Sequence, residues 1–157
     1  LMIQPLVLHP DPRLSEVSAP VVAFEEDLAA LVRDLFDTMY DAPGRGLAAI
    51  QIGVTARVFV MDAGWKGGAP SPIAFVNPVI TDHGTELAVQ EEGCLSIPNT
   101  PRRVARPAQV TLRWQDIQGE PQEATFTGFE AACVQHEFDH LEGLTILDHP
   151  EPLEAGA

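Results

Sequence analysis

The sequence predicts an α+β domain, with small antiparallel or mixed sheets packed around a central C-terminal helix and another helix near the N-terminus. A helical apolar pattern at 24–41, strand-like segments in the middle and a second helical segment at 128–141 are the observations that predict it. The chain has 157 residues, 45% of them hydrophobic, which is enough for a real core. We therefore expect a single domain over residues 1–157.

The first helix is predicted from an apolar stripe that repeats every three or four residues. Acidic residues occupy its first turn, where the helix dipole favours anions, and Pro43-Gly44 ends it. Prolines between residues 5 and 20 predict an extended loop before the helix. The stripe consists of Leu28, Leu31, Val32, Leu35, Phe36, Met39 and Tyr40.

The middle of the chain contains strand-like segments separated by turn residues. Residues 73–80 are predicted to form a strand that lies at a sheet edge or bends, because Asn77-Pro78 interrupts it. A turn at 116–119 joins two segments as a hairpin. Glycine, proline and serine across 64–72 predict a surface loop. The other predicted strands lie at 57–61, 110–114 and 123–127.

The second helix carries the segment Gln135-His136-Glu137-Phe138-Asp139-His140-Leu141. His136 and His140 are four residues apart, so both imidazoles can reach one metal ion from the same helix face. Glu137 adjoins that face and can act as general base toward a water molecule at the metal. Two ligands do not complete a metal site, so a third ligand is expected elsewhere in the chain.

That third ligand is predicted upstream of the helix. One class of zinc proteases continues the motif to a third histidine, but Ile146 occupies that position. Another class uses a glutamate on a following helix, and residues 141–157 are too few for one. Two cysteines compete, and we favour Cys94 over Cys133. A backbone bend can aim Cys94, whereas a helical cysteine is more often a small buried hydrophobe. A thiolate with two imidazoles leaves one position open, the catalytic arrangement.

Charge and cysteine content narrow the class of protein. The formal net charge is −14, from 23 acidic and 9 basic residues, which argues against nucleic acid as the main partner. Two cysteines make no disulfide framework, so we expect both to be reduced in an intracellular, cytoplasmic protein. The first residues lack the basic and apolar regions of a secretory leader, and no run approaches the ~18 apolar residues of a membrane span.

Three segments in this order and spacing resemble the peptide deformylase family, and the resemblance extends from about residue 5 to residue 148. They are Gly44-Arg45-Gly46-Leu47-Ala48-Ala49-Ile50-Gln51, Glu92-Gly93-Cys94-Leu95-Ser96 and the histidine segment 135–141. The resemblance implies a metal-dependent hydrolase that removes the formyl group from the N-terminal formylmethionine of new polypeptides and releases formate.

The same resemblance implies a role for each matched residue. Glu137 would be the catalytic acid/base, and the Gln51 side chain and Leu95 backbone N–H would donate hydrogen bonds to the developing oxyanion. Fe(II) would be the physiological metal, with zinc, nickel or cobalt as substitutes. The implied ligands are Cys94, His136 and His140.

The implied substrate pocket departs from the family at several positions. Arg45 and Gln90 are polar where the family has mostly aliphatic residues, and Phe129 and Ala132 change the pocket's shape. We expect the Arg45 stem to line the pocket and its head group to reach solvent, where it would favour acidic residues further along a formyl-Met peptide. The residues expected to bind substrate are Gly44, Arg45, Gly46, Gln90, Glu92, Gly93, Phe129, Ala132 and Cys133.

Alternatives remain open at this point. The chain could be a deformylase paralogue with another substrate preference, a metallopeptidase, or a metal-binding paralogue without catalytic activity. The presence of Glu137 and Gln51 argues against the last of these, because an inactive paralogue has no need of them. N-formylated nascent polypeptides are the expected partners, and a transient ribosome contact is a further expectation. The acidic tail at 149–157 is expected to fray, and Met2 rather than Leu1 is the expected natural start.

Overall fold

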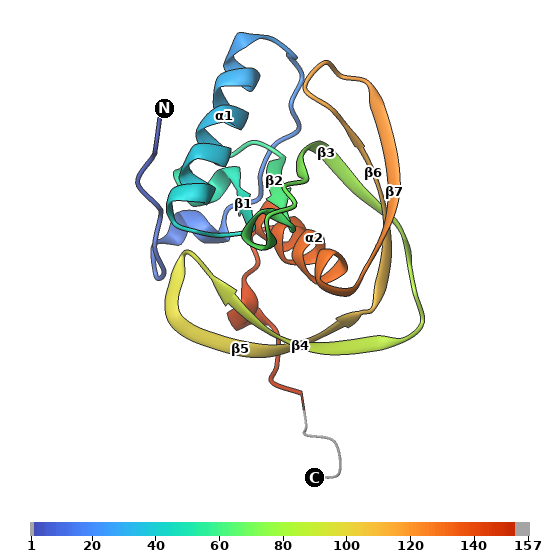
Figure 1. Ribbon diagram of the computed structural model, residues 1–157. Coiled ribbons are helices and arrows are strands. Elements are labelled where there is room, and N and C mark those ends of the chain that lie inside the picture. Colours follow the sequence, from blue (N-terminus) through green and yellow to red (C-terminus); the bar gives the residue numbers. More distant parts are fainter. Residues whose placement is uncertain (1, 153–157) are drawn as a thin grey trace.

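The computed structural model describes residues 2–152, so Leu1 and the end of the tail predicted to fray, residues 153–157, lie outside the description. The C-terminal helix α2 (Gly128–Leu141) lies in the centre of the molecule, with strands on several sides of it (Figure 1). The N-terminal helix α1 (Glu26–Asp41) lies on the other side of strands β1 and β2. The predicted α+β class, with a central C-terminal helix, is therefore confirmed.

The strands form two antiparallel sheets in the described part of the chain. One is a hairpin of β4 and β5, and the other has the strand order β1-β2-β3-β6-β7. The hairpin strands are β4 (Leu87–Cys94) and β5 (Ile97–Pro107). The five-stranded sheet consists of β1 (Gly46–Ala48), β2 (Val58–Asp62), β3 (Pro72–His83), β6 (Gln109–Gln115) and β7 (Pro121–Thr127).

Strand β2 shows why the two helices pack on opposite faces of the sheet. Its side chains alternate in direction, as in any strand, yet every residue of it is buried. Val58 and Val60 belong to the apolar cluster around α1, whereas Phe59 and Met61 belong to the cluster around α2. The sheet is thus covered on both faces at β2, which matches the continuous apolar run of this segment.

Helix α2 is buried far more completely than a surface helix would be. Residues 131–137 are all buried, together with the last turn at His140 and Leu141. A helix surrounded by protein cannot leave its polar side chains in water, so each of them needs a partner or a function. None of the helices among residues 2–152 is long and apolar enough to cross a membrane.

Strand β3 corrects part of the sequence prediction. It lies between β2 and β6, so the predicted edge position is wrong, but the predicted bend is confirmed by register shifts after Val76 and Ile80. Asn77 has a positive φ of 51° at the first shift, and its side chain bonds both the N–H and the carbonyl of Val21. The proline is tolerated because the ladder is already interrupted there.

Two further differences concern the site. Strand β5 covers eleven residues where the sequence predicted no strand, because its prolines and arginines interrupt any alternating apolar pattern and the strand is recognisable only from its pairing with β4. Gln51 lies in a short 3-10 helix, η2 (Ala49–Ile52), directly after β1. His149, the first residue of the tail expected to fray, makes hydrogen bonds with Asp139 and Arg102.

Candidate active site

Three buried side chains bring metal-binding atoms together at the centre of the molecule. Within residues 2–152, Cys94, His136 and His140 are the group whose ligand atoms all lie within 4.8 Å of one another. The Cys94 Sγ is 3.5 Å from Nε2 of His140. The two imidazole rings, one helical turn apart on α2, have their centroids 5.1 Å apart. One thiol and two imidazoles are a donor set that iron, zinc or cobalt accepts.

Cys94 reaches this place because strand β4 is irregular at its end. The ladder between β4 and β5 shifts register between Glu92 and Cys94, and a two-residue turn follows. Cys133, the competing cysteine, is not in the metal-binding group and has its Sγ 4.0 Å from the carbonyl oxygen of Arg45. Burial, followed by nearby carboxylates, raises the pKa of the Cys133 thiol well above its ordinary value. Cys133 is therefore held as a neutral thiol.

The two histidines are oriented differently. Nδ1 of His136 lies 3.0 Å from a carboxylate oxygen of Glu92, which leaves Nε2 directed at the metal-binding group. Nδ1 of His140 is buried and has no hydrogen-bond partner among the described residues. Burial, followed by the proximity of His136 and Arg106, lowers the pKa of His140 well below its ordinary value. A neutral imidazole is the form that binds a metal, so this environment fits the group that the motif implies.

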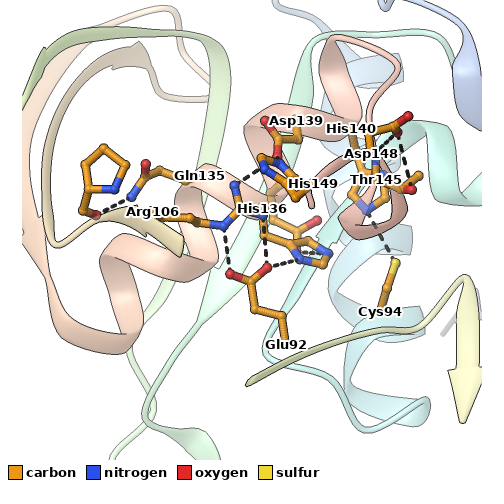
Figure 2. A network of polar contacts seen from close by, with 12 residues as sticks. Glu92, Cys94, Arg106, Gln135, His136, Asp139, His140, Thr145, Asp148 and His149 are labelled. Carbon is orange, nitrogen blue, oxygen red and sulfur yellow. Dashed lines mark hydrogen bonds and ion pairs between the residues drawn. The ribbon is translucent and has the colours of Figure 1, made fainter. Parts of the chain in front are cut away.

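Glu92 is the residue whose role the sequence analysis missed. We expected it to bind substrate, and it does line the pocket. It also accepts two hydrogen bonds from Arg106, at 2.7 and 2.9 Å, and contacts His136 (Figure 2). Burial alone would raise the pKa of Glu92, but the hydrogen bonds from His136 and Arg106 outweigh it and hold that pKa below its ordinary value. A carboxylate in this position fixes the tautomer and direction of a metal-binding imidazole.

Arg106 extends the contact into a chain of polar residues. Its guanidinium also donates to Asp139 at 2.9 Å, and the same carboxylate oxygen of Asp139 lies 2.8 Å from Nε2 of His149 (Figure 2). Arg106 is 5% exposed, so a charge buried this deeply is stable only with such partners. The contact between Arg106 and Glu92 depends on the pairing of β5 with β4, in which Arg106 lies opposite Ala88. The sequence could have revealed this contact only if that pairing had been predicted.

Glu137 lies beside the metal-binding group without belonging to it. Its Oε2 is 4.0 Å from Nε2 of His136, and its Oε1 is buried with no hydrogen-bond partner in the described chain. Burial raises the pKa of Glu137 to about 7. Gly46 makes room for it, because a Cβ on Gly46 would lie 2.7 Å from Oε2. A partnerless carboxylate that titrates near neutrality suits a group that transfers protons.

The side chain of Gln51 also points toward the metal-binding group, at Cys94. Its side-chain oxygen accepts a hydrogen bond from the backbone of Ala48 at 3.0 Å, which fixes the orientation of the amide. The amide nitrogen then donates to Ser96 Oγ at 3.0 Å and points at the Cys94 Sγ, 3.7 Å away. An amide nitrogen carries two hydrogens, and the second, which is directed at the thiol, could instead be donated to a ligand beside the thiol. Leu95 occupies the turn directly after Cys94.

A pocket of about 580 Å³ opens above these groups. Every residue that the sequence analysis assigned to catalysis or substrate binding lines this pocket, and so do Cys94 and His136. His140 lies beneath it and is fully buried. Residues that the analysis missed also line it, among them Lys66, Ile97, Asn99 and Thr100.

Arg45 lies at the mouth of this pocket. Its side chain is exposed, and the central carbon of its guanidinium lies 5.0 Å from the centroid of the Phe129 ring. Two of the positions that depart from the family therefore contact each other, as a cation on an aromatic face. Gln90 is half-buried on the opposite wall, formed by β4.

Comparisons with known proteins agree with the family resemblance found in the sequence motifs. The sequence model of the polypeptide deformylase family matches residues 3–155. The chain is 48% identical to a peptide deformylase of Phenylobacterium zucineum over 149 residues, covering 95% of this chain and 88% of the relative. It is 45% identical to that of Brucella suis over 154 residues, with 98% and 88% covered.

A solved structure shares the fold as well. The peptide deformylase of Thermotoga maritima matches with a TM-score of 0.91 at 37% identity, covering 97% of this chain and 100% of that one. The match to the family thus extends over nearly the whole chain and includes both sheets and both helices. The chain belongs to the peptide deformylase family, the metal-dependent enzymes that remove the N-terminal formyl group from newly made polypeptides.

Proposed function

We propose that Cys94, His136 and His140 hold one divalent metal, with Fe(II) as the physiological ion and zinc, nickel or cobalt as substitutes. The observation that carries the proposal is the convergence of their three ligand atoms within 4.8 Å at the base of a pocket. When bound, the metal would activate a water molecule and polarise the formyl carbonyl. The remaining steps belong to side chains of the protein.

Glu137 moves the protons in this proposal. It takes one from the attacking water and returns it to the amine nitrogen that leaves when the formyl C–N bond breaks, so that formate and a free amino terminus result. The support is its position beside the ligand set, its partnerless oxygen and a pKa raised by burial to about 7. A group with that pKa can act as base and as acid at neutral pH.

Gln51 and the Leu95 N–H stabilise the negative charge that develops on the formyl oxygen. Gln51 is pre-oriented by the Ala48 N–H and by Ser96 Oγ, so it needs no rearrangement during the reaction. Such a donor contributes about 2.7–4 kcal/mol to the transition state.

The substrate is held as an added strand. The Arg45 carbonyl accepts from the Asp62 N–H at 2.8 Å, so the backbone groups of Gly46, the next residue, point to the opposite side, toward the pocket. Strand β1 is at the edge of its sheet, and an extended peptide can pair with it there. The adjoining pocket would take the first side chain, methionine. Its substrate-binding residues are those predicted from the sequence.

N-formylated nascent polypeptides are the proposed partners, and the reaction is placed in the cytoplasm. Any ribosome contact would be transient, since 23 acidic residues against 9 basic ones do not favour binding to RNA.

The test uses protein prepared without oxygen, with its metal content measured. Formate release from formyl-Met-Ala-Ala should occur and should stop when the metal is removed. Cys94→Ser should lose most of the metal, while Cys133→Ser should retain it. Peptide-bond cleavage without formate release would show a peptidase instead, and equal metal retention by both variants would exclude Cys94 as the ligand.

A further inference from the structure

Two basic side chains lie at the mouth of the pocket in a strongly acidic protein. Arg45 and Lys66, here called the basic rim, both line the pocket and are both exposed. The whole chain has only nine basic residues and a net charge of −14, so two cations at one opening are a concentration of positive charge. Such a local field acts on charged ligands at the opening rather than on the fold.

The basic rim is not used by the fold's own ion pairs. Within residues 2–152, neither Arg45 nor Lys66 lies within 4.0 Å of a carboxylate, whereas other arginines are paired with carboxylates at 2.7–2.9 Å. Those paired arginines are Arg13, Arg57, Arg106 and Arg113. The two cations of the basic rim are therefore available to a ligand.

Both cations rest on aromatic side chains, which restricts where they can lie. Arg45 lies over Phe129, and the Lys66 nitrogen lies 5.8 Å from the centroid of the Trp65 ring. Trp65 in turn donates from Nε1 to the Gly44 carbonyl at 2.9 Å, which ties the loop that carries Lys66 to the segment that would pair with a peptide. An ordered cation loses less entropy on binding than a free one.

The opposite wall has the other sign of charge. Glu91 is exposed and lines the pocket from β4. Glu130 does not line the pocket; it shares an adjoining hollow with Arg45 and Phe129. A peptide that passes between β1 and β4 therefore has cations on the β1 side and a carboxylate on the β4 side. Paired with β1, its side chains alternate between the two faces of the extended sheet, so one side chain can lie on the face of the basic rim while the next points to the other face.

We infer that the basic rim selects formylated peptides with an acidic side chain at the second or third residue. The inference rests on the proposed function, because it needs the formyl group to lie at the metal-binding group. An acidic side chain on the face of the basic rim would pair with Arg45 or Lys66. A basic side chain at the same position would meet like charges.

The expected effect is modest, since both cations are exposed. One exposed ion pair changes an equilibrium by about 1.5- to 5-fold, so the glutamate-to-lysine preference in kcat/KM should be about 3- to 20-fold when attraction is compared with repulsion. The preference should decline as salt rises from about 10 mM to about 500 mM, because the Debye length shortens.

The experiment compares formyl-Met-Glu-Ala with formyl-Met-Lys-Ala, and formyl-Met-Ala-Glu with formyl-Met-Ala-Lys, by formate release from the metal-loaded enzyme. Formyl-Met-Ala-Ala is the neutral reference. The variants are Arg45→Met, Lys66→Met and the reversal Arg45→Glu. Arg113→Met is the matched control, because it removes one positive charge from a 70%-exposed side chain on β6 outside the pocket.

The glutamate preference should fall in Arg45→Met and Lys66→Met, invert in Arg45→Glu and persist in Arg113→Met. A wild-type enzyme that cleaves formyl-Met-Ala-Ala but treats glutamate and lysine peptides alike overturns the inference and leaves the proposed function intact. An enzyme that releases formate from none of the peptides, with metal bound, contradicts the proposed function itself. An unchanged preference in Arg45→Glu likewise rejects the basic rim.

Discussion

The base of the pocket and its mouth differ in how their side chains are held: those at the base are buried and bonded to one another, whereas those at the mouth are exposed. At the base, His136 is held by Glu92, which is held by Arg106, and all three side chains are buried. At the mouth, Arg45 and Lys66 are exposed and contact mainly an aromatic face each. Under the proposed roles, the reaction geometry depends on several mutually dependent contacts, whereas the inferred substrate preference depends on a few independent side chains. Substitutions should therefore be severe and non-additive at the base, and mild and additive at the mouth.

The largest effect is expected from Glu137→Ala. It should lower kcat by about 10²–10⁴-fold, because it removes a positioned acid/base. Metal content should stay at one ion per chain, since Glu137 is outside the ligand set. Formate release and metal analysis on the same sample provide the measurement. A near-normal kcat would mean that another group transfers the proton.

Gln51→Ala should follow, with a loss in kcat of about 10²–10³-fold. The hydrogen bond strengthens as charge develops, so KM for formyl-Met-Ala-Ala should change much less than kcat. Ser96→Ala serves as the comparison, because it removes one of the two hydrogen bonds that orient Gln51, keeps the one from the Ala48 N–H and leaves the Gln51 donor in place. A fall in kcat/KM that came entirely from KM would remove Gln51 from transition-state stabilisation.

Arg106→Met tests whether the base acts as one unit. It leaves Glu92 and Asp139 without their shared cation, so metal affinity should fall about 10–100-fold. The free energy of unfolding should fall by about 3–5 kcal/mol, because a buried charge loses its partner. Competition with a chelator and chemical denaturation give the two quantities. Arg113→Met, which breaks an exposed pair, should change both by little.

The smallest effect is expected at the mouth. Phe129→Leu removes the ring beneath Arg45, and the cation–π contact of an exposed pair contributes about 0.5–1 kcal/mol. The glutamate-to-lysine preference in kcat/KM should weaken by less than about fivefold, without loss of metal. In the double variant with Lys66→Met, the two changes in the glutamate-to-lysine preference should be additive as free energies, so their fold-changes should multiply. A strongly non-additive pair would show that the mouth, like the base, is a coupled unit.

Much of the fold and of the candidate ligand set could be predicted from local pattern. The α1 stripe and the spacing of His136 and His140 are properties of one helix, so periodicity reveals them. The roles of Glu92 and Arg106 could not be predicted in this way, because they depend on the pairing of β4 with β5 and on a helix distant in sequence. Strand β3 was placed at an edge because Pro78 cannot donate to a ladder, yet a register shift accommodates it inside the sheet.

The two tryptophans of the chain give the protein two optical reporters with separate meanings. Trp65 is half-buried and bonded to Gly44 at the pocket mouth, whereas Trp114 is 8% exposed and packs against Phe75 and Phe126 in the core. A peptide that enters the pocket should change the surroundings of the first indole through Gly44, which lines the pocket, and should leave the second unchanged. Unfolding exposes both. In a Trp114→Phe protein, intrinsic fluorescence would thus follow the occupancy of the site, and in a Trp65→Phe protein it would follow the integrity of the core.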